Sequence, residues 1–439
     1  MKNKSLMRLL LILIVGSVLA SRSSLAQNQK RNYEIDDLIK VIRISDRVIV
    51  VRTGVTYFEA VTAIATQKGI VLIDAGNTLQ LTEKYKKIII KELGRNDFIY
   101  LINTHSHRDH TGGNQVFSAA KIIGHERSKE AMIREWNDKE AYSEILRNGI
   151  KEGTERLKNM DITTEAGKQA YYELTKYVMV QSDIGPGNNH VTTVPTITFN
   201  DNMTLALGDI TVELMYFGNA HSEGDTWVYI PEEKLLFNGD VFFRNGAPNL
   251  TYFATEETSG IDEVKRWRKV LSYLLRPDRP VETIVRGHGD ILNFNDLKNF
   301  SQHIAGIWNE FEKGKEIYPL SRMGNMLEKE GVDAARAEFQ KLRTVDRDKY
   351  FFLERGFNVM GNKFLSPNKT AAAIELCKIN VELFPQSANA YERLAETYMK
   401  VGNKELAIKN YEKSLELNPQ NTNASEQIKK LREKNQGEK

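Results

Sequence analysis

Apolar and polar positions along the chain predict a β-rich first half in which helices are interspersed. Residues 41–51 and 57–75 carry runs of β-branched residues, a pattern typical of strands. Asp74 begins the turn that ends the second run. The apolar residues of 81–93 have helical spacing, and the continuous apolar run 98–102 predicts a buried strand.

The same reading continues to about residue 313. It predicts three polar helices, at 126–148, 151–160 and 164–177. Short strands joined by turns are expected at 194–199, 203–207, 210–216, 226–230, 234–237 and 281–285, with helices at 260–275 and 295–313. Such a mixture of strands and helices predicts two packed sheets flanked by helices, an α+β fold.

The C-terminal part of the chain is predicted to be all-helical and repetitive. Pro385 and Pro419 lie 34 positions apart, which is the tetratricopeptide period. The second copy is the clearer one, and Ala335 and Phe339 indicate an earlier, irregular helix pair. Generic amphipathic helices are the alternative interpretation. The second copy places its expected residues at Tyr391, Leu394, Ala395, Tyr398, Gly402, Ala407, Tyr411 and Pro419, and the weaker first copy at Phe357, Met360, Gly361, Ala373 and Cys377.

Length and charge limit the classes of protein to consider. The 439 residues exceed one typical domain, and 41% hydrophobic content supports a sizeable core. Removing residues 1–26, which hold four basic and no acidic residues, changes the net charge from +3 to −1. The sequence therefore gives no electrostatic case for nucleic-acid binding.

The first 26 residues have the pattern of a signal peptide. Lys2, Lys4 and Arg8 precede the apolar run 9–20, and the segment Ser24-Leu25-Ala26 has small residues at the two positions that a signal peptidase reads. We expect an exported protein, periplasmic or secreted, without a membrane anchor after cleavage. An uncleaved anchor is the alternative. Cys377 is the single cysteine, so export here implies no internal disulfide.

The densest cluster of candidate metal ligands lies in the run Thr104-His105-Ser106-His107-Arg108-Asp109-His110. Three of the chain's eight histidines and one carboxylate fall within six residues, directly after the predicted strand 98–102. Neutral imidazole and carboxylate are ligands that suit zinc and similar metals. The sequence therefore predicts a metal site at the carboxyl end of a strand.

This cluster resembles the His-x-His-x-Asp-His motif of the metallo-β-lactamase superfamily of hydrolases. Further motifs of the family occur in the right order, at 217–225 around His221, at 236–240 ending in Gly-Asp, and at 286–289 around His288. The resemblance covers roughly residues 40–310 and implies an αββα sandwich. The gap between His110 and His221 is long for the family, and its helices either cover the active site or form a packing layer.

The resemblance also implies the roles of individual residues. One zinc would be held by His105, His107 and His221, and a second by Asp109, His110 and His288, with Asp240 bridging the two. Asp109 could in addition orient the attacking water or accept a proton. Asp74 and Thr104 are expected to support the ligands, although a turn-forming role for Asp74 is the plain alternative. His125, His190 and His303 match no motif and are expected to be structural or surface residues.

Two functions follow as hypotheses. The first is an exported, dinuclear zinc hydrolase in which a metal-bridging hydroxide attacks an ester, lactam, lactone, thioester or phosphodiester. Asp240, where some lactamases have Cys, resembles the glyoxalase, lactonase and broader hydrolase branches, and iron or a mixed-metal site is compatible with the same ligands. The second is a tetratricopeptide-based scaffold with a structural metal domain, although all ligand positions are intact.

The expected organisation has four parts. They are a signal peptide at 1–26, a catalytic domain of the metallo-β-lactamase fold at 27–313 with a helical insertion at about 126–180, a helical connector at 314–349, and tetratricopeptide-like repeats at 350–439. Expected partners are a small-molecule substrate, and a protein or a second copy of the chain at the repeats.

Overall fold

The computed structural model describes the chain from residue 34 onward, with short gaps. The described residues are 34–54, 59–135, 139–158, 160–185, 190–242, 261–318, 320–364, 369–419 and 421–436. The predicted signal peptide lies outside them. Contacts divide the chain into two compact units, residues 1–249 with 270–300 and residues 250–269 with 301–439. Within the described residues, no helix has the length and apolar character that a bilayer crossing requires.

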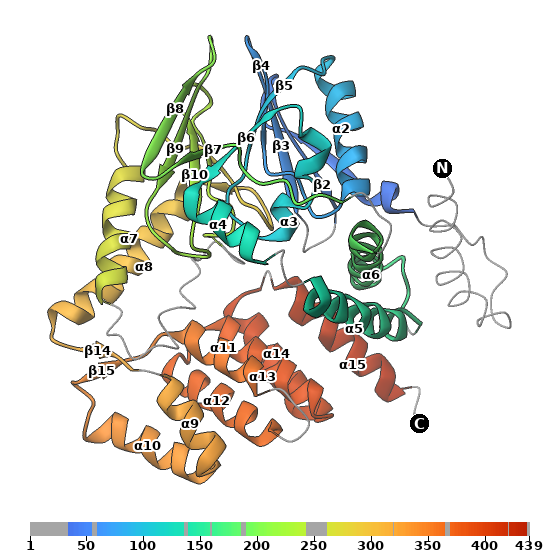
Figure 1. Ribbon diagram of the computed structural model, residues 1–439. Coiled ribbons are helices and arrows are strands. Elements are labelled where there is room, and N and C mark those ends of the chain that lie inside the picture. The colour runs from blue at the N-terminus through green and yellow to red at the C-terminus, as the bar shows by residue number, and fades with distance from the viewer. Residues whose placement is uncertain are drawn as a thin grey trace, which may run out of the picture. The chain divides into compact units, whose positions relative to one another are not determined.

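The first unit contains two large sheets (Figure 1). The seven strands of the first sheet are ordered as in the chain, antiparallel from β1 to β4 and parallel from β4 to β7. These strands are β1 (Ile39–Arg43), β2 (Val48–Thr53), β3 (Ala60–Thr66), β4 (Gly69–Ile73), β5 (Phe98–Ile102), β6 (Lys121–His125) and β7 (Ile197–Phe199).

The second sheet has six strands in the order β13-β12-β11-β10-β9-β8. Its neighbours are antiparallel except for β11 and β12, which are parallel. The strands are β8 (Asn202–Ala206), β9 (Thr211–Tyr216), β10 (Thr226–Ile230), β11 (Leu235–Phe237), β12 (Thr283–Val285) and β13 (Leu292–Asn293).

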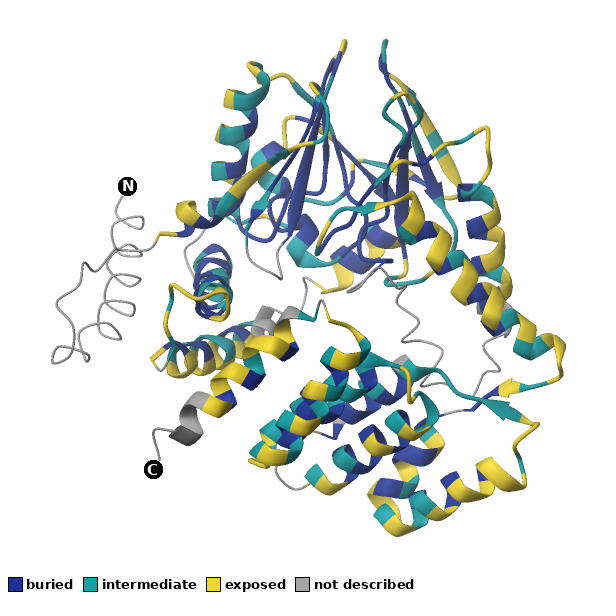
Figure 2. Ribbon diagram, turned by 180° about the vertical axis from the view of Figure 1, so that it is seen from behind, coloured by how far each residue is buried: buried dark blue, intermediate teal, exposed yellow. Residues whose placement is uncertain are grey.

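The inner faces of the two sheets bury a shared core. Ile64 and Ile102 of the first sheet and Leu214 and Val228 of the second are fully buried in one hydrophobic cluster. Alternate residues of a strand point to opposite faces, so the same strands also supply side chains to an outer cluster. The dark blue strands in Figure 2 show that central strands are buried on both faces, as a layered fold requires.

Helices cover the outer faces. α2 (Leu79–Leu93) and α6 (Glu165–Ile184) pack on the first sheet through a cluster that includes Tyr85, Tyr172 and Leu174. On the second sheet, Phe217 contacts Tyr273 of α7 (Ile261–Leu274), and Phe242 contacts Phe300 of α8 (Phe294–Glu312). The predicted layer order of helices, sheet, sheet and helices is confirmed.

Several predicted elements differ from the structure in their bounds. The insertion contains α4 (Glu126–Glu135), α5 (Lys139–Lys158) and α6, so the predicted helix 126–148 is wrong as one element, and the predicted helix 151–160 is the second half of α5. Strand β6 was not predicted, because five residues that include Gly124 give little periodic signal. Since α6 packs on the core, the packing-layer interpretation of the insertion is favoured.

The second unit is helical apart from the short pair β14 (Glu316–Ile317) and β15 (Tyr350–Phe351). Its helices pack in sequential pairs, and the irregular pair indicated by Ala335 and Phe339 shares one hydrophobic cluster with the next pair. The helices are α9 (Leu320–Lys329), α10 (Val332–Thr344), α11 (Glu354–Lys363), α12 (Thr370–Leu383), α13 (Ala388–Lys400), α14 (Lys404–Leu417) and α15 (Thr422–Gln436).

Candidate metal centre

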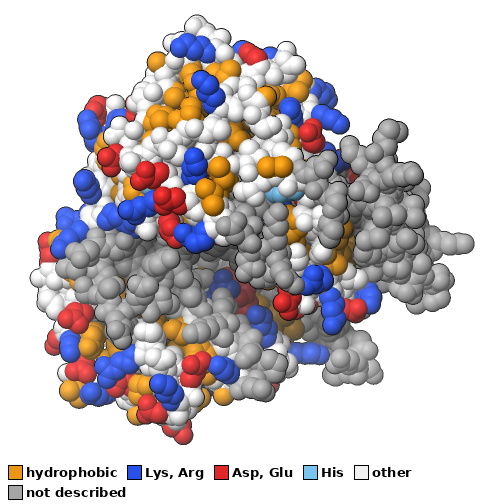
Figure 3. Space-filling view, in the orientation of Figure 1, with side chains coloured by type: hydrophobic (Ala, Val, Ile, Leu, Met, Phe, Trp, Pro, Cys, Tyr) orange, Lys and Arg blue, Asp and Glu red, His pale blue; other side chains and the backbone are white. Residues whose placement is uncertain are grey.

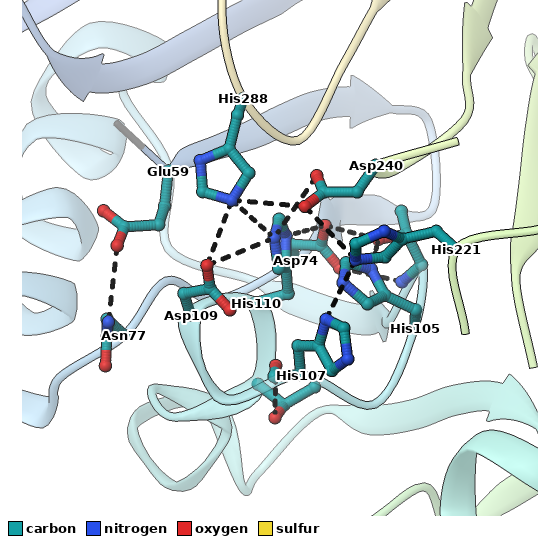
Figure 4. A network of polar contacts seen from close by, with 12 residues as sticks. Glu59, Asp74, Asn77, His105, His107, Asp109, His110, His221, Asp240 and His288 are labelled. Atoms are coloured by element: carbon teal, nitrogen blue, oxygen red, sulfur yellow. Dashed lines mark hydrogen bonds and ion pairs between the residues drawn. The ribbon is translucent and has the colours of Figure 1, made fainter. Parts of the chain in front are cut away.

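All seven predicted ligand residues follow the carboxyl ends of strands. His105 and His107 lie in the loop after β5, and Asp109 and His110 lie on the single-turn helix α3 (Arg108–Thr111) that continues it. The remaining three residues come from the second sheet: His221 follows β9, Asp240 follows β11 and His288 follows β12. Because these strand ends meet at one edge of the sandwich, residues far apart in the sequence converge there (Figure 4).

The converging atoms form three overlapping groups. In each group, one ligand atom per residue lies within 4.8 Å of the others. The groups are His105 with His107 and His221, His105 with His110 and Asp240, and Asp109 with His110 and His288. The structure therefore brings every predicted ligand residue into one cluster, shared between two predicted metal positions.

Asp240 lies between the two halves of this cluster. Its Oδ1 is 3.5 Å from His110 Nε2, and its Oδ2 is 3.5 Å from His221 Nε2 and 3.3 Å from His288 Nε2. At the second half, His288 Nε2 is 3.0 Å from Asp109 Oδ2. One carboxylate thus faces histidines of both predicted metal positions.

The buried carboxylate of Asp74 fixes the histidine rings. Its Oδ2 accepts a hydrogen bond from His110 Nδ1 at 2.9 Å and another from Thr104 Oγ1 at 2.7 Å, and its Oδ1 accepts from the Thr104 backbone N–H at 2.8 Å. Because Nδ1 of His110 carries the hydrogen, Nε2 of the neutral ring keeps its lone pair for a metal. Asp74 was expected to accept from a ligand histidine, and this contact is present.

Thr104 sets the tautomer of a second ligand ring, that of His105. Its hydroxyl hydrogen is donated to Asp74, so its oxygen accepts from His105 Nδ1, which lies 3.1 Å away. The Nε2 atom of His105 then carries the lone pair. This Nε2 atom is buried and has no hydrogen-bond partner among the described residues. A buried imidazole nitrogen without a partner costs free energy unless a cation occupies the space before it.

Sequence reasoning missed the role of Asp225, which shapes the loop that carries His221. The Asp225 carboxylate is buried and accepts hydrogen bonds from the backbone N–H groups of Ala220 at 2.8 Å, His221 at 2.7 Å and Ser222 at 3.0 Å. The Ser222 hydroxyl donates a further bond of 2.7 Å. The available signal was an Asp four residues after a candidate ligand, since Asp side chains close turns on nearby backbone N–H groups.

Glycines allow the loops to approach one another at the site. A Cβ added at Gly287 would lie 2.2 Å from Asp240 Oδ1 and 2.5 Å from His110 Cε1. Gly239, with a φ of 51°, precedes Asp240 in a left-handed conformation that favours glycine. The Gly112-Gly113 pair likewise lies against the loop after Asp74. A Cβ at Gly112 would be only 2.1 Å from the Asn77 carbonyl oxygen, so this close approach requires glycine.

The electrostatics of the cluster favour a cation. Burial opposes the charge on His110, yet the carboxylates of Asp240, Asp109 and Asp74 raise its pKa well above the usual value. Burial, together with the nearby His110, His221 and His107, lowers the pKa of His105 well below its usual value. The carboxylates thus stabilise positive charge at the His110 end, while His105 stays neutral and available as a ligand.

The chemistry of these residues fits zinc. Five imidazoles and two carboxylates converge, with histidine tautomers set by outer hydrogen bonds, as in zinc sites. Two imidazole pairs face each other nitrogen to nitrogen, at 3.0 Å for His107 and His221 and at 3.2 Å for His110 and His288. Two facing imidazole nitrogens that both lack a proton repel each other, so each pair favours a proton or a metal cation between its nitrogens.

Among the histidines outside the motifs, His125 makes structural contacts. His125 Nε2 lies 2.7 Å from the Asn200 carbonyl oxygen, and its ring stacks on Tyr216 with centroids 3.8 Å apart. Cys377 is buried in α12 of the second unit, with its sulfur 3.4 Å from Thr397 Oγ1.

Comparisons with known proteins identify both parts of the chain. The model of the metallo-beta-lactamase superfamily matches residues 56–288, and the tetratricopeptide repeat model matches residues 388–421. The first match covers more than half of the chain. The chain therefore belongs to the metallo-β-lactamase superfamily, and its C-terminal part contains a tetratricopeptide repeat.

Individual relatives are more distant. The metallo-beta-lactamase type 2 of Bacteroides fragilis is 27% identical over 97 residues, which make up 22% of this chain and 36% of that protein. Two solved structures are each 17% identical and match over 61% of this chain. They are a metallo-beta-lactamase from Pontibacter korlensis, with a TM-score of 0.40 over 99% of its chain, and TMB-1, with a TM-score of 0.38 over 98% of its chain.

Replacing Asp74 with Asn tests the control of the histidine rings. The amide of Asp74→Asn has one acceptor oxygen and turns an NH2 group either toward the Thr104 backbone N–H or toward Thr104 Oγ1 and His110 Nδ1. It cannot keep all three hydrogen bonds, so the ligand rings are held less firmly. We expect zinc affinity to fall about 10- to 100-fold, measured by competition with a chromophoric chelator. The control is Asp97→Asn, because Asp97 pairs with Arg95 away from the cluster. Unchanged zinc affinity in Asp74→Asn would contradict this role.

Proposed function

We propose that the protein is an exported, dinuclear zinc-dependent hydrolase that uses water to cleave an ester, lactam, lactone, thioester or phosphodiester bond. The observation that carries the proposal is the convergence of seven imidazole and carboxylate side chains in three overlapping groups. Membership of the superfamily supports hydrolysis, and the ligand chemistry supports zinc. Iron or a mixed pair of metals is the variant of this proposal that the same donors admit.

The proposed ligands divide into two sets. His105, His107 and His221 would hold one zinc, and Asp109, His110 and His288 the second, with Asp240 contributing to both. Bound zinc lowers the pKa of water to about 7 and polarises a carbonyl or phosphoryl oxygen. Three protein ligands for each metal, plus a shared carboxylate, leave room for water and substrate, which is typical of catalytic sites.

Asp109 is the proposed catalytic carboxylate. Its side chain is 30% exposed, whereas that of Asp240 is 4% exposed, so Asp109 is the carboxylate that solvent and substrate reach. Although burial opposes ionisation, the charges of His110 and His288 lower its pKa well below the usual value. An ionised Asp109 can therefore orient a water molecule and accept its proton at a carboxylate oxygen.

The repeats are proposed to bind a protein partner or a second copy of the chain. The matched tetratricopeptide repeat supports a protein-interaction role, and such repeats present extended binding surfaces. On the described part of the face in view in Figure 3, Lys and Arg are interspersed with Asp and Glu. A purely scaffolding function is the alternative, and it predicts no turnover.

Hydrolysis by the zinc-loaded protein lacking residues 1–26 tests the proposed function. A β-lactam, a lactone, a thioester and a phosphodiester would be compared, with His107→Ala as the inactive variant. We expect turnover of one class and a loss of at least about 100-fold in His107→Ala, because one zinc loses a ligand. If the zinc-loaded protein hydrolyses none of the four compounds, these substrate classes are wrong. If the protein binds no zinc, the scaffold function is favoured.

Zinc binding is expected to strengthen as the pH rises. His110 and His288 have raised pKa values without metal, so both must lose protons before they can bind zinc. In the metal-free protein, the protonated imidazoles of these histidines stabilise the fold through their contacts with carboxylates. This stabilisation is fully present below the ordinary histidine pKa of about 6.5, and it is lost as the pH rises through the raised pKa values of the folded protein. The stabilisation of the fold by zinc should therefore grow from about pH 6 to about pH 8.

Thermal melts with and without zinc across this range measure the effect. For each proton that zinc binding releases, the zinc affinity should rise up to about tenfold for each pH unit. His110→Ala is the comparison variant and should flatten the dependence. A zinc-induced shift that is independent of pH would contradict the assigned ligands.

Export is tested by expressing the full chain in a bacterium and fractionating the cells. The basic start and apolar run of residues 1–20 and the small residues Ser24 and Ala26 support cleavage after Ala26. We expect a mature N-terminus at Gln27 by mass spectrometry, in the periplasm or the medium. Replacement of residues 10–13 by charged residues should retain the protein in the cytoplasm. A full-length chain in the cytoplasmic fraction would contradict export.

A further inference from the structure

The inserted helix α6 carries charged residues that reach toward the metal cluster. Its Tyr172, Leu174 and Val178 pack in the outer core of the first sheet, which accounts for its position as a packing layer. Packing of this kind needs only apolar side chains. Lys176 and Asp183 on the same helix instead form polar contacts with Glu59, just before β3, and with the first turn of α2.

The first contact is a buried ion pair. Glu59 is 1% exposed, and its carboxylate accepts hydrogen bonds from Lys176 Nζ at 3.0 Å, from Asn77 Nδ2 at 3.3 Å and from the Tyr172 hydroxyl. Figure 4 shows Glu59 and Asn77 in the close-up of the cluster. The positive charge of Lys176 also acts on the carboxylate of Asp109.

The second contact lies near the end of the same helix. The Asp183 carboxylate accepts a hydrogen bond of 2.9 Å from the backbone N–H of Leu79, in the first turn of α2. Its charge interacts with that of Arg108, which stands between the candidate ligands His107 and Asp109. Helix α6 is therefore tied at two separate points, to Glu59 and to Leu79, and the charges of Lys176 and Asp183 act on Asp109 and Arg108 of α3.

Asn77 connects the ion pair to the ligand helix. Its side chain is bound by Glu59, and its carbonyl oxygen lies so close to Gly112 that a Cβ there would be only 2.1 Å away. Gly112 immediately follows α3, the turn that carries Asp109 and His110. A shift of Glu59 would thus move Asn77 and, through this backbone contact, the two ligands.

We propose that Lys176, through its buried ion pair with Glu59, is a positioning residue that holds α3 and its ligands Asp109 and His110 in place for the second zinc. The proposal rests on the proposed function. A buried ion pair contributes little net stability compared with a well-packed apolar pair. The ion pair contacts Asn77, and the charge of Lys176 acts on Asp109. An apolar pair at the same place could neither bind Asn77 nor act on the Asp109 charge.

Stepwise zinc titration against a chelator tests this inference with the protein lacking residues 1–26. Lys176→Met should weaken the second zinc-binding step about 10- to 100-fold and leave the first nearly unchanged. Lys176→Arg keeps the charge and should restore most of the affinity. Lys168→Met is the matched control, since it removes a lysine from the same helix that pairs with the exposed Glu165.

A second variant separates positioning from folding. Lys176→Met leaves the Glu59 charge buried without its cation, which lowers the melting temperature. Glu59→Gln/Lys176→Met removes both charges and should regain thermal stability, while its second zinc step stays weak. Wild-type zinc affinity in the double variant would overturn the inference and assign the pair to stability alone. A wild-type protein that binds no zinc would instead overturn the proposed function, and this inference with it.

Discussion

The Asp74 carboxylate is the constraint on which the site depends. It accepts three hydrogen bonds, two from Thr104 and one from His110, and so sets the tautomers of two candidate ligand rings. Asp74 has a positive φ of 59°, a conformation that costs roughly 1–3 kcal/mol in a non-glycine residue. Hydrogen bonds to a charged acceptor contribute about 1.5–3 kcal/mol each, so the three bonds can offset that strain. The strained turn at the end of β4 is thereby held against the end of β5.

The layered fold brings the remaining ligands to this point. The candidate ligands follow strands of both sheets at the edge where their carboxyl ends meet, and close glycine contacts at Gly239 and Gly287 let the loops approach. Asp225 arranges the His221 loop by the same means as Asp74, a buried carboxylate that collects N–H and O–H donors. Rigid hydrogen-bonded loops on a packed sandwich are suited to fixed ligand geometry.

Local patterns predicted the parts of this arrangement that are contiguous in sequence. The strands β5 and β10 were predicted with their observed bounds, because each is rich in β-branched and aromatic residues. The His105–His110 cluster was predicted because its ligands are adjacent in the chain. Strand β6 escaped prediction because it is short and contains glycine, and the pairing of Glu59 with Lys176 did so because it joins residues 117 positions apart. Such contacts are set by tertiary packing and leave no local periodicity.

The central claim is that the seven converging side chains hold two metal ions. Anomalous diffraction at the zinc absorption edge, from crystals of the protein grown with zinc, tests it most directly. The account predicts two peaks about 3.5–4 Å apart, one beside His105, His107 and His221 and one beside Asp109, His110 and His288. A single peak would reduce the centre to one metal, and no peak within the cluster would contradict the account.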